Sequence, residues 1–207
     1  MFTGLIQRTA IIAAKDVTAT GIRLVLEPPS AVASDRTRLA PSPLSLGESI
    51  AVQGCCLTLV SEEDGLRFDV IHQTLSLTTL GRLGVGTPVN IERSATPTTL
   101  LGGHLVQGHV DGVGRIVLVS GAGGEWRVRV ASPGDLMRYL MPRGSITIDG
   151  VSLTVAAVDD ATGTFDVCLI PETLARTTLG SLKPDSEVNL EADCVAKMVE
   201  RTLAWRG

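Results

Sequence analysis

The feature that most constrains the fold of this sequence is an internal repeat with a period close to one hundred residues. Residues 49–59 (SIAVQGCCLTL) return 96 positions later as residues 145–155 (SITIDGVSLTV). Residues 74–81 and 89–92 return at a spacing of 99, and residues 4–6 more weakly at 104. Two copies of this length are too long for solenoid units and are typical of a duplicated domain. We therefore expect homologous domains at 1–104 and 105–192, followed by a separate segment at 193–207.

Each copy is predicted to be a small barrel of short strands. Runs rich in Val, Ile and Thr, bounded by Gly, Pro or Asp, predict strands near 107–119, 125–130, 145–158 and 164–170. Short helices are expected after Gln73 and after Pro171, with Gly81 and Gly180 as their C-caps, and another helix over 133–140. Many short strands with frequent glycines favour a closed barrel in each copy, so the predicted fold class is all-β.

Two segments stand outside this repeat. Residues 27–46 lengthen the first copy and contain four prolines and four serines, which predicts a surface loop. At the other end Asp193 is a predicted N-cap, followed by apolar residues at helical spacing from Val195 to Leu203. A helix of about a dozen residues needs a packing partner. It could dock on its own barrel or pair with copies of itself.

Composition excludes several classes of function. The chain has 18 basic and 22 acidic residues without a block of like charge, and only 3% aromatic residues, so we expect no nucleic-acid partner. Its longest apolar run falls short of the roughly 18 residues of a membrane span. No signal peptide is expected. The cysteines at 55, 56, 168 and 194 form no CxxC pair, so a disulfide framework, a zinc site or any other metal site is not expected, and a cytoplasmic location is predicted.

Strand alternation separates the side chains of the two repeated strands. Leu57, Leu59, Leu153 and Val155 share the predicted core face, whereas Cys56 with Thr58, and Ser152 with Thr154, share the other. These polar pairs could be ordinary strand residues or could line two ligand sites. If both faces bind, a duplicated frame should bind two similar ligands, which suggests a reaction between identical molecules.

Among the histidines, His109 is the best candidate to move protons near neutral pH, with a satisfied histidine at the domain junction as the alternative. His104 follows two glycines and is interpreted as a linker residue, and His72 as a surface residue. No dinucleotide fingerprint, P-loop, hydrolase elbow or zinc-protease motif occurs. The chemistry is therefore predicted to need no cofactor.

Six motifs in order give the chain a close resemblance to the riboflavin synthase (alpha chain) family. They are MFTG at 1–4, GCCLT at 54–58, GGHLV at 102–106, GHVDG at 108–112, DGVSLT at 149–154 and IPETL at 170–174. The resemblance implies two six-stranded Greek-key barrels and a C-terminal helix that assembles a homotrimer. It implies dismutation of two 6,7-dimethyl-8-ribityllumazine molecules to riboflavin and 5-amino-6-ribitylaminouracil, with no metal or redox cofactor.

The resemblance also implies a site between the N-terminal barrel of one subunit and the C-terminal barrel of its neighbour. A first pocket would be lined by Gly4, Leu5, Ile6, Cys56, Leu57, Thr58, Asp69, Val70, Ile71, His72, Gln73 and Thr74. A second pocket would be lined by Gly108, His109, Val110, Arg143, Ser152, Leu153, Thr154, Cys168, Leu169, Ile170, Pro171, Glu172 and Thr173.

The same resemblance suggests roles for individual residues. His109 and Thr154 would transfer protons at the acidic methyl group, and Cys56 or Ser152 would act as nucleophile or hydrogen-bonding group. Phe2 would pack over the ring, and Asp193 would act across the trimer interface.

Arg143 and Gln107 depart from the lysine and serine usual in the family. A non-catalytic antenna protein of the same fold is the alternative function, and docking onto a lumazine synthase capsid is left open.

Overall fold

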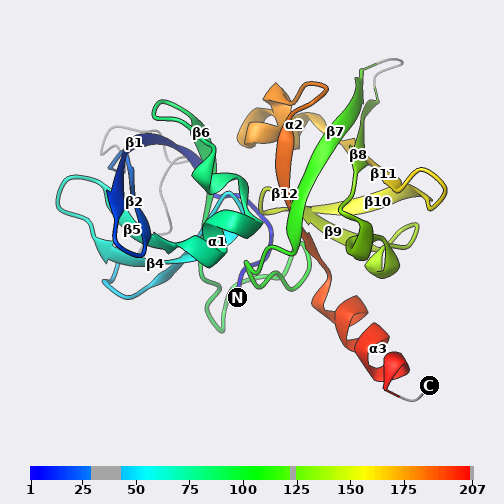
Figure 1. The fold of residues 1–207 in the computed structure, drawn as a ribbon, viewed down its shortest axis with the longest axis horizontal. Helices are drawn as coiled ribbons and strands as arrows, with labels where there is room; N and C mark the ends of the chain where they lie inside the picture. The colour runs from blue at the N-terminus through cyan, green and yellow to red at the C-terminus, as the bar shows by residue number, and fades with distance from the viewer. Residues whose placement is uncertain (29–42, 122–124, 206–207) are drawn as a thin grey trace.

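The computed structural model describes residues 1–28, 43–121 and 125–205, and it contains two closed β-barrels lying side by side (Figure 1). Each barrel has six strands, and every strand pairing is antiparallel. The predicted all-β duplication is therefore confirmed. Most of the predicted proline-rich loop at 27–46 lies outside the described residues.

The two barrels have the same topology. The first consists of β1 (Arg8–Thr18), β2 (Gly21–Leu26), β3 (Ser49–Val52), β4 (Cys55–Ser61), β5 (Leu66–Ile71) and β6 (Pro88–Arg93). The second consists of β7 (Gly112–Ser120), β8 (Trp126–Ala131), β9 (Ser145–Ile148), β10 (Val151–Asp159), β11 (Thr164–Leu169) and β12 (Glu187–Ala192). Around the first barrel the order is β1-β2-β5-β4-β3-β6, and the second repeats it with β7 to β12, a Greek-key arrangement.

Short helices follow the fifth strand of each barrel, as predicted: α1 (His72–Leu77) and α2 (Pro171–Arg176). The predicted glycine C-caps are wrong, because the helices end at Thr78 and Thr177 in extended conformation. Each threonine then caps a 3-10 turn, η2 (Thr79–Gly81) or η5 (Thr178–Ser181). The helix predicted over 133–140 is a 3-10 helix, η4 (Gly134–Tyr139), and the strand predicted from 107 begins only at 112.

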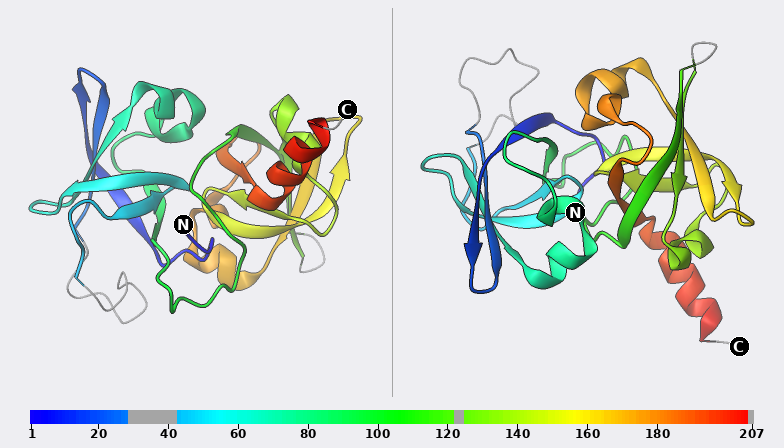
Figure 2. Two further views of the ribbon diagram at one scale, coloured as in Figure 1. Left: turned by 90° about the horizontal axis from the view of Figure 1, so that it is seen from below. Right: turned by 45° about the horizontal axis from the view of Figure 1, so that its top comes forward.

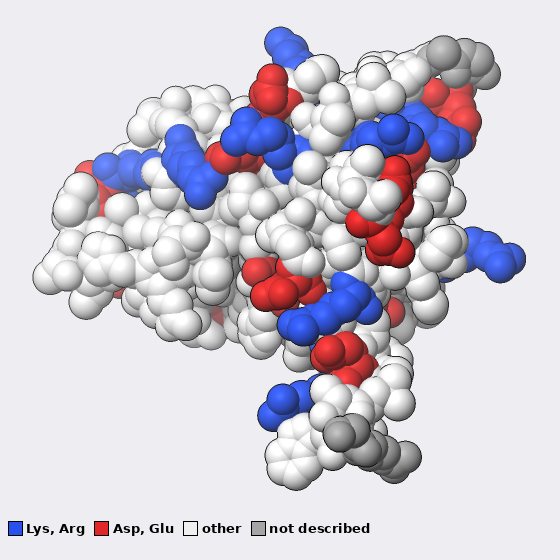
Figure 3. Space-filling view, turned by 45° about the vertical axis from the view of Figure 1, so that its right-hand side comes forward, with Lys and Arg blue, Asp and Glu red and all other residues white. Residues whose placement is uncertain are grey.

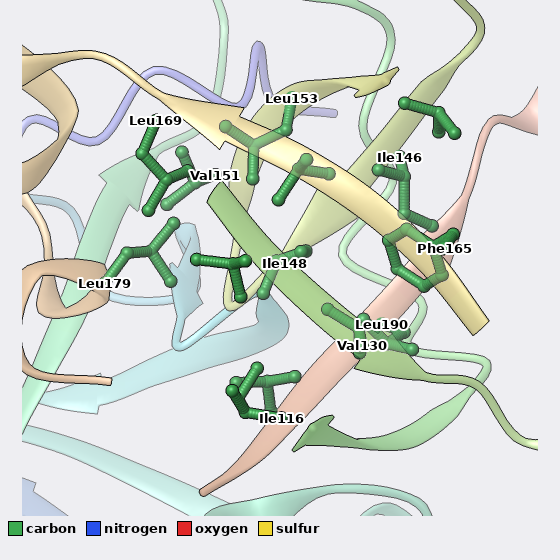
Figure 4. Close-up of a cluster of buried hydrophobic side chains, with 14 of the residues drawn as sticks. Ile116, Val130, Ile146, Ile148, Val151, Leu153, Phe165, Leu169, Leu179 and Leu190 are labelled. Carbon is green, nitrogen blue, oxygen red and sulfur yellow. The ribbon is translucent and has the colours of Figure 1, made fainter. Parts of the chain in front are cut away.

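Alternation of side chains fills each barrel. Leu57 and Leu59 point into the first core, and Leu153 and Val155 into the second, as predicted. Figure 4 shows Leu153 in the second core beside Ile146 and Phe165. The second core also contains Ile6, which lies before the first barrel in sequence. In return, Val110 packs against the first core. Each barrel is thus completed by a residue from the other half of the chain.

A reciprocal hydrogen-bond network joins the barrels. The Asn90 side chain donates to the Asp149 carbonyl and accepts from the Thr178 amide, at 2.9 and 2.8 Å. Its counterpart Asn189 donates to the Gln53 carbonyl and accepts from the Thr79 amide, at 2.8 and 2.7 Å. Both asparagines are fully buried, so this network fixes the barrels with near two-fold symmetry.

Two segments pass between the barrels, and we call them the N-terminal crossing segment (2–6) and the central crossing segment (103–110). They meet in an antiparallel bridge between Phe2 and Val106, whose two backbone hydrogen bonds measure 2.7 and 3.1 Å. The chain start lies beside this junction between the barrels (Figure 2). The crossing segments are therefore part of the interface that carries the predicted site residues.

The C-terminal helix α3 (Cys194–Ala204) projects away from both barrels (Figure 1). Asp193 caps it, as predicted, by accepting a hydrogen bond of 2.9 Å from the Val195 amide. Val195, Met198, Val199 and Leu203 are exposed along it. Within the described part of the chain, no helix combines the length and apolar character that crossing a membrane requires.

Candidate functional site

A cavity of about 210 Å³ lies where the central crossing segment meets the first barrel. The barrel contributes Cys55 and Cys56 from the start of β4 and four residues from α1 and its end. The crossing segment contributes Gly108, His109 and Val110. The complete lining is Cys55, Cys56, Gln73, Thr74, Leu77, Thr78, Gly108, His109 and Val110. We call this cavity the first pocket.

This lining contradicts the prediction of which crossing-segment residues line which pocket. Gly108, His109 and Val110 were expected in the second pocket but lie in the first, where the Cys56 amide donates to the Gly108 carbonyl at 2.9 Å. Gly4, Leu5 and Ile6 were expected in the first pocket. Instead the Ser152 amide donates to the Gly4 carbonyl at 2.8 Å, and Ile6 enters the second core. The two segments are exchanged, which pattern matching within each copy does not reveal.

Glycine is required at both points of exchange. Gly4 and Gly108 have φ of +74° and +77°. A Cβ on Gly4 would lie 2.5 Å from the Ser152 Cβ, and one on Gly108 would lie 2.7 Å from the Cys56 Cβ. Only glycine combines this backbone conformation with so close an approach. The same backbone geometry recurs around Ser152 in the second barrel, and we refer to the surroundings of Ser152 as the second pocket, by analogy with the first.

Two buried glutamates hold the crossing segments in place. Glu92 on β6 accepts hydrogen bonds from the amides of Thr3 and Gly4, at 2.7 and 3.0 Å. Glu191 on β12 accepts from the amides of Gln107 and Gly108, at 2.8 and 2.9 Å. Burial raises the pKa of both carboxyl groups, against the opposing effect of these hydrogen bonds. Neither residue was predicted, although both end the repeated segments 89–92 and 188–191.

Ser152 has a histidine partner in the second pocket. Nδ1 of His104 lies 2.7 Å from the Ser152 Oγ, and Nε2 lies 3.2 Å from the Thr147 Oγ1. Burial lowers the pKa of His104, while the negative charge of Asp193 acts in the opposite direction. The interpretation of His104 as a linker residue is wrong. The sequence feature that could have indicated a role in the site is the position of His104, four residues before Gly108 in the segment that crosses between the barrels.

Cys56 has an apolar environment by contrast. Phe2, Ala51 and Val106 form a small buried cluster, and Cys56 packs against it. Phe2 is only 1% exposed. The prediction that its ring packs over a ligand is therefore wrong for this conformation, because the ring is buried beneath the pocket and supports its wall from behind.

Some predicted binding residues point into the cores. Leu57, Val70, Leu153 and Leu169 are buried in the barrel interiors, so their side chains do not line a pocket. Other residues lie on the outer faces or in the helices, where they are exposed: Thr58, Asp69, Ile71, His72, Thr154, Ile170, Pro171 and Glu172. Cys168 and Thr173 are half-buried. Alternation along the strands separates these two groups.

Three predicted residues are already engaged in contacts. Asp69 forms an ion pair with Arg23 at 2.8 Å, which lowers the pKa of the Asp69 carboxyl. The Cys168 Sγ lies 2.8 Å from a Glu125 carboxylate oxygen, and burial raises the pKa of the thiol. Arg143 is exposed with φ of +70° and donates its amide to the Val155 carbonyl at 2.7 Å.

A larger cavity lies elsewhere, in the cleft between the barrels. Its volume is about 500 Å³, and it is lined by Gln53, Thr79, Arg82, Leu83, Thr87, Pro88, Arg115, Asp149, Thr178, Ser181, Leu182, Asp185, Ser186 and Glu187. None of the predicted site residues is among them. Arg82 pairs with Glu187 at 2.5 Å on its rim, and charges of both signs alternate over the face shown in Figure 3. We therefore place the candidate site at the crossing segments.

Comparison with known proteins gives one family. A family model described as "Lumazine binding domain" matches twice, at residues 3–94 and 107–193. Proteins named riboflavin synthase from Mycobacterium tuberculosis and Mycobacterium bovis are 40% identical over the full length of both chains. The riboflavin synthase of Actinobacillus pleuropneumoniae is also 40% identical, over 98% of this chain and 90% of that one.

Solved structures give the same family by shape. The crystal structure of LumP complexed with 6,7-dimethyl-8-(1'-D-ribityl) lumazine has a TM-score of 0.78 and 27% identity, and the similarity covers 93% of this chain and 99% of that one. LumP complexed with riboflavin also has a TM-score of 0.78, with 28% identity.

Proposed function

This chain belongs to the lumazine-binding domain family and, within it, to the riboflavin synthases, which are transferases; on this premise we propose the reaction and the site. The reaction is the dismutation of two 6,7-dimethyl-8-ribityllumazine molecules. One donates a four-carbon unit to the other, and the products are riboflavin and 5-amino-6-ribitylaminouracil. All atoms of the two substrates are recovered in the two products.

One observation carries this proposal: both barrels have the same backbone arrangement around the candidate reactive residue, which we call the pocket frame. In each, the amide of a small nucleophilic residue, Cys56 or Ser152, donates to the carbonyl of an exchanged glycine, Gly108 or Gly4. Two such frames suit two copies of one ligand. His109 and Thr154 are exposed near these frames, where we propose that they transfer protons at the methyl group that reacts.

Size supports completion of the site by a second copy of the chain. The first pocket holds about 210 Å³, below the roughly 300–1,000 Å³ of typical small-molecule sites. Its lining contains no residue from β7 to β12. We propose that the second pocket of a neighbouring subunit closes over the first, so that the two lumazines meet face to face.

The exposed face of α3 supports self-association. Between this helix and η4 lies a groove of about 350 Å³, whose apolar lining includes Tyr139, Leu140, Met141, Val199 and Leu203. An apolar face of this kind on a protruding helix favours burial against another chain. We propose a homotrimer built on it, with Asp193, which also lines the groove, near the shared site.

A second candidate function is a non-catalytic lumazine or flavin binder. The structural similarity to LumP bound to lumazine and riboflavin favours it. Sequence identity is higher to the riboflavin synthases, at 40% against 27–28%. The chain also keeps polar residues in both pocket frames, whereas a binder needs only one.

The test is to incubate the purified chain with 6,7-dimethyl-8-ribityllumazine alone and follow riboflavin by absorbance and chromatography. We expect one riboflavin for every two lumazines consumed. Bound but unconverted lumazine would instead establish the binder, and neither binding nor turnover would refute both functions. A trimer in sedimentation that dissociates on Val199→Glu, with loss of turnover, would support the shared site.

A further inference from the structure

The C-terminal helix contacts the end of the central crossing segment through an ion pair. Nζ of Lys197 on α3 lies 2.6 Å from Oδ2 of Asp111, the residue that directly follows this segment. The two side chains are only 23% and 27% exposed, so the pair is largely shielded from water. A shielded pair keeps more of its Coulomb attraction than an exposed one.

Asp111 in turn fixes the crossing segment to the last strand of the second barrel. The same Oδ2 accepts a hydrogen bond of 2.8 Å from the amide of Ala192, at the end of β12. The Asp111 amide donates to the Leu190 carbonyl, also at 2.8 Å. Lys197 therefore pairs with a carboxylate that already holds one end of the crossing segment in place.

Lys197 also acts on a second attachment of this segment. Glu191 is 3% exposed and accepts hydrogen bonds from the amides of Gln107 and Gly108, at 2.8 and 2.9 Å. These bonds are strongest while the carboxyl group is ionised. Burial raises the pKa of Glu191, whereas the positive charge of Lys197 lowers it, so Lys197 favours the ionised form.

The first barrel also places a titratable group near Glu191, the thiol of Cys55. Burial, the neighbouring Cys56 and the Glu191 carboxylate together raise the pKa of this thiol to about 12. The thiol is therefore uncharged near neutral pH. Within the described part of the chain, the charged side chain that acts on Glu191 is Lys197.

The residues between these two attachments form a wall of the first pocket. Gly108, His109 and Val110 line the cavity, and they lie between Gln107 and Asp111 in sequence. The position of this wall thus depends on two carboxylates that share one lysine of α3.

The first copy has the same backbone contact without the lysine. Gln7 stands where the second copy has Asp111, and its Oε1 accepts from the Arg93 amide at 3.0 Å. Thr98 stands where the second copy has Lys197. A neutral side chain is therefore enough for the backbone contact, and the ion pair is an addition that belongs to the second copy and its helix.

We propose that Lys197 is a positioning residue that transmits the placement of α3 to the first pocket, by holding the central crossing segment through Asp111 and Glu191. The exposed apolar residues on which self-association is proposed lie on the same helix. Association of the chains and the position of the pocket wall are thereby linked. The inference rests on the proposed function, because it names the ligand and the assembly of that site.

The test compares Lys197→Met with Lys197→Arg in the full-length chain, at a protein concentration where sedimentation gives the same assembly as for the wild type. In a fluorescence titration that resolves two lumazine sites per chain, Lys197→Met should weaken one site about tenfold and leave the other unchanged. The value of kcat/KM for riboflavin formation should fall by at least as much. Lys197→Arg keeps the charge and should restore most of the loss.

The pH profile separates this role from a merely structural one. Without the charge of Lys197 the pKa of Glu191 should rise, so the ionised form that holds both amides is lost at a higher pH on acidification. The acid limb of lumazine affinity at the weakened site should therefore move to higher pH in Lys197→Met and stay in place in Lys197→Arg.

The matched control is Arg201→Met, which removes the same charge one helical turn further along α3. Arg201 lies over the Trp205 ring, at 5.8 Å from its centroid, and not beside the crossing segment. This variant should keep the wild-type affinity at both sites and the wild-type acid limb.

An unchanged affinity in Lys197→Met, equal weakening of both sites, an acid limb that does not move, no recovery in Lys197→Arg, or the same effects in Arg201→Met would each overturn the proposal. If Lys197→Met does not assemble, Asp111→Asn breaks the ion pair while its amide oxygen can still accept from Ala192, and unchanged affinity there would overturn it. A wild-type chain that binds lumazine without converting it refutes the proposed reaction only, because the affinity measurements still decide the role of Lys197.

Discussion

The two pockets have the same backbone frame and different chemistry behind it. In the first, Cys56 lies on the buried cluster of Phe2, Ala51 and Val106. In the second, Ser152 is hydrogen-bonded to His104, which also contacts Thr147. Both pockets share three features. Each contacts a crossing segment from the other half of the chain, each has a glycine in that segment, and in each a buried glutamate holds a crossing segment in place. Backbone geometry is thus kept in a duplication, while the side chains behind the reactive residue are where the copies differ.

The largest effect is expected from substitution of the exchanged glycines. Gly108→Ala places a methyl 2.7 Å from the Cys56 Cβ and 2.8 Å from its amide nitrogen, at φ of +77°. Gly4→Ala does the same at Ser152. Each should lower the free energy of unfolding by about 3–5 kcal/mol, measured by urea denaturation.

If the variants fold, Gly108→Ala should abolish lumazine binding at the first pocket and Gly4→Ala at the second, in a stoichiometric titration. Gly84→Ala is the control, since a Cβ there would meet nothing within 4 Å. If either variant lost lumazine binding at both pockets, the prediction that each glycine shapes only its own pocket would be contradicted.

Removal of the buried glutamates should have the next largest effect. Glu191→Ala leaves the amides of Gln107 and Gly108 without their acceptor, and Glu92→Ala does the same to Thr3 and Gly4. Unpaired buried donors cost about 1–3 kcal/mol each, so for two donors we expect a loss of about 2–6 kcal/mol in the free energy of unfolding, measured by thermal and urea denaturation. Glu→Gln at either site should recover part of it. An unchanged stability in both alanine variants would contradict their role as anchors.

A third prediction concerns Asp149, which stands where the first copy has Gln53. Burial raises the pKa of Asp149 to about 7. Since its ordinary pKa is 3.8, the folded state binds this proton more tightly than the unfolded state between about pH 4 and 7. Its contribution to stability is therefore present at low pH and lost as pH rises to 7.

Asn at this position has no titrating group. Between pH 5 and pH 7 the free energy of unfolding of Asp149→Asn should therefore fall by about 2 kcal/mol less than that of the wild type, measured by urea denaturation. Glu92 and Glu191, whose pKa values are also raised, should leave a residual slope of the same sign. If the free energy of unfolding depended equally on pH in Asp149→Asn and the wild type, the raised pKa of Asp149 would be contradicted.

The smallest difference is expected between two ion pairs on the walls of the two barrels. In the second barrel the side chain of Asp166 is 4% exposed and is held by Arg129 at 2.7 Å and by Arg127 at 3.3 Å. In the first, Asp69 is 45% exposed and is held by Arg23. Arg23→Ala should change stability by less than about 0.5 kcal/mol, and Arg129→Ala by about 1 kcal/mol. Equal effects in thermal unfolding would contradict the difference in burial.

Sequence periodicity predicts the barrels and the helices because both depend on local alternation and on the matching of the copies. Leu57 and Leu153 illustrate this, since the parity that puts them in the cores also puts Cys56 and Ser152 outside. The exchange of Gly4 and Gly108 between barrels could not be predicted in this way. A repeat relates residues of the same type, but it does not say which barrel a connecting segment contacts.

The prediction that His104 is a linker residue fails for a related reason. Its two glycine neighbours are typical of a linker, yet Gly103 is required by close packing against Ser152. Phe2 matched a family motif, and its burial depends on the bridge to Val106, which only the three-dimensional structure brings together. Residues whose environment comes from distant segments are those that local patterns describe least well.

The N-terminal crossing segment has a consequence for the order in which the molecule is assembled during translation. Gly4 is synthesised well before Ser152, whose amide donates to the Gly4 carbonyl in the folded chain. Ile6 likewise waits for the second core. A first barrel that forms early would carry an undocked N-terminal crossing segment, and a pocket without its far wall, until the second copy is complete. A segment that is synthesised before the first barrel is thus among the last to reach its final position.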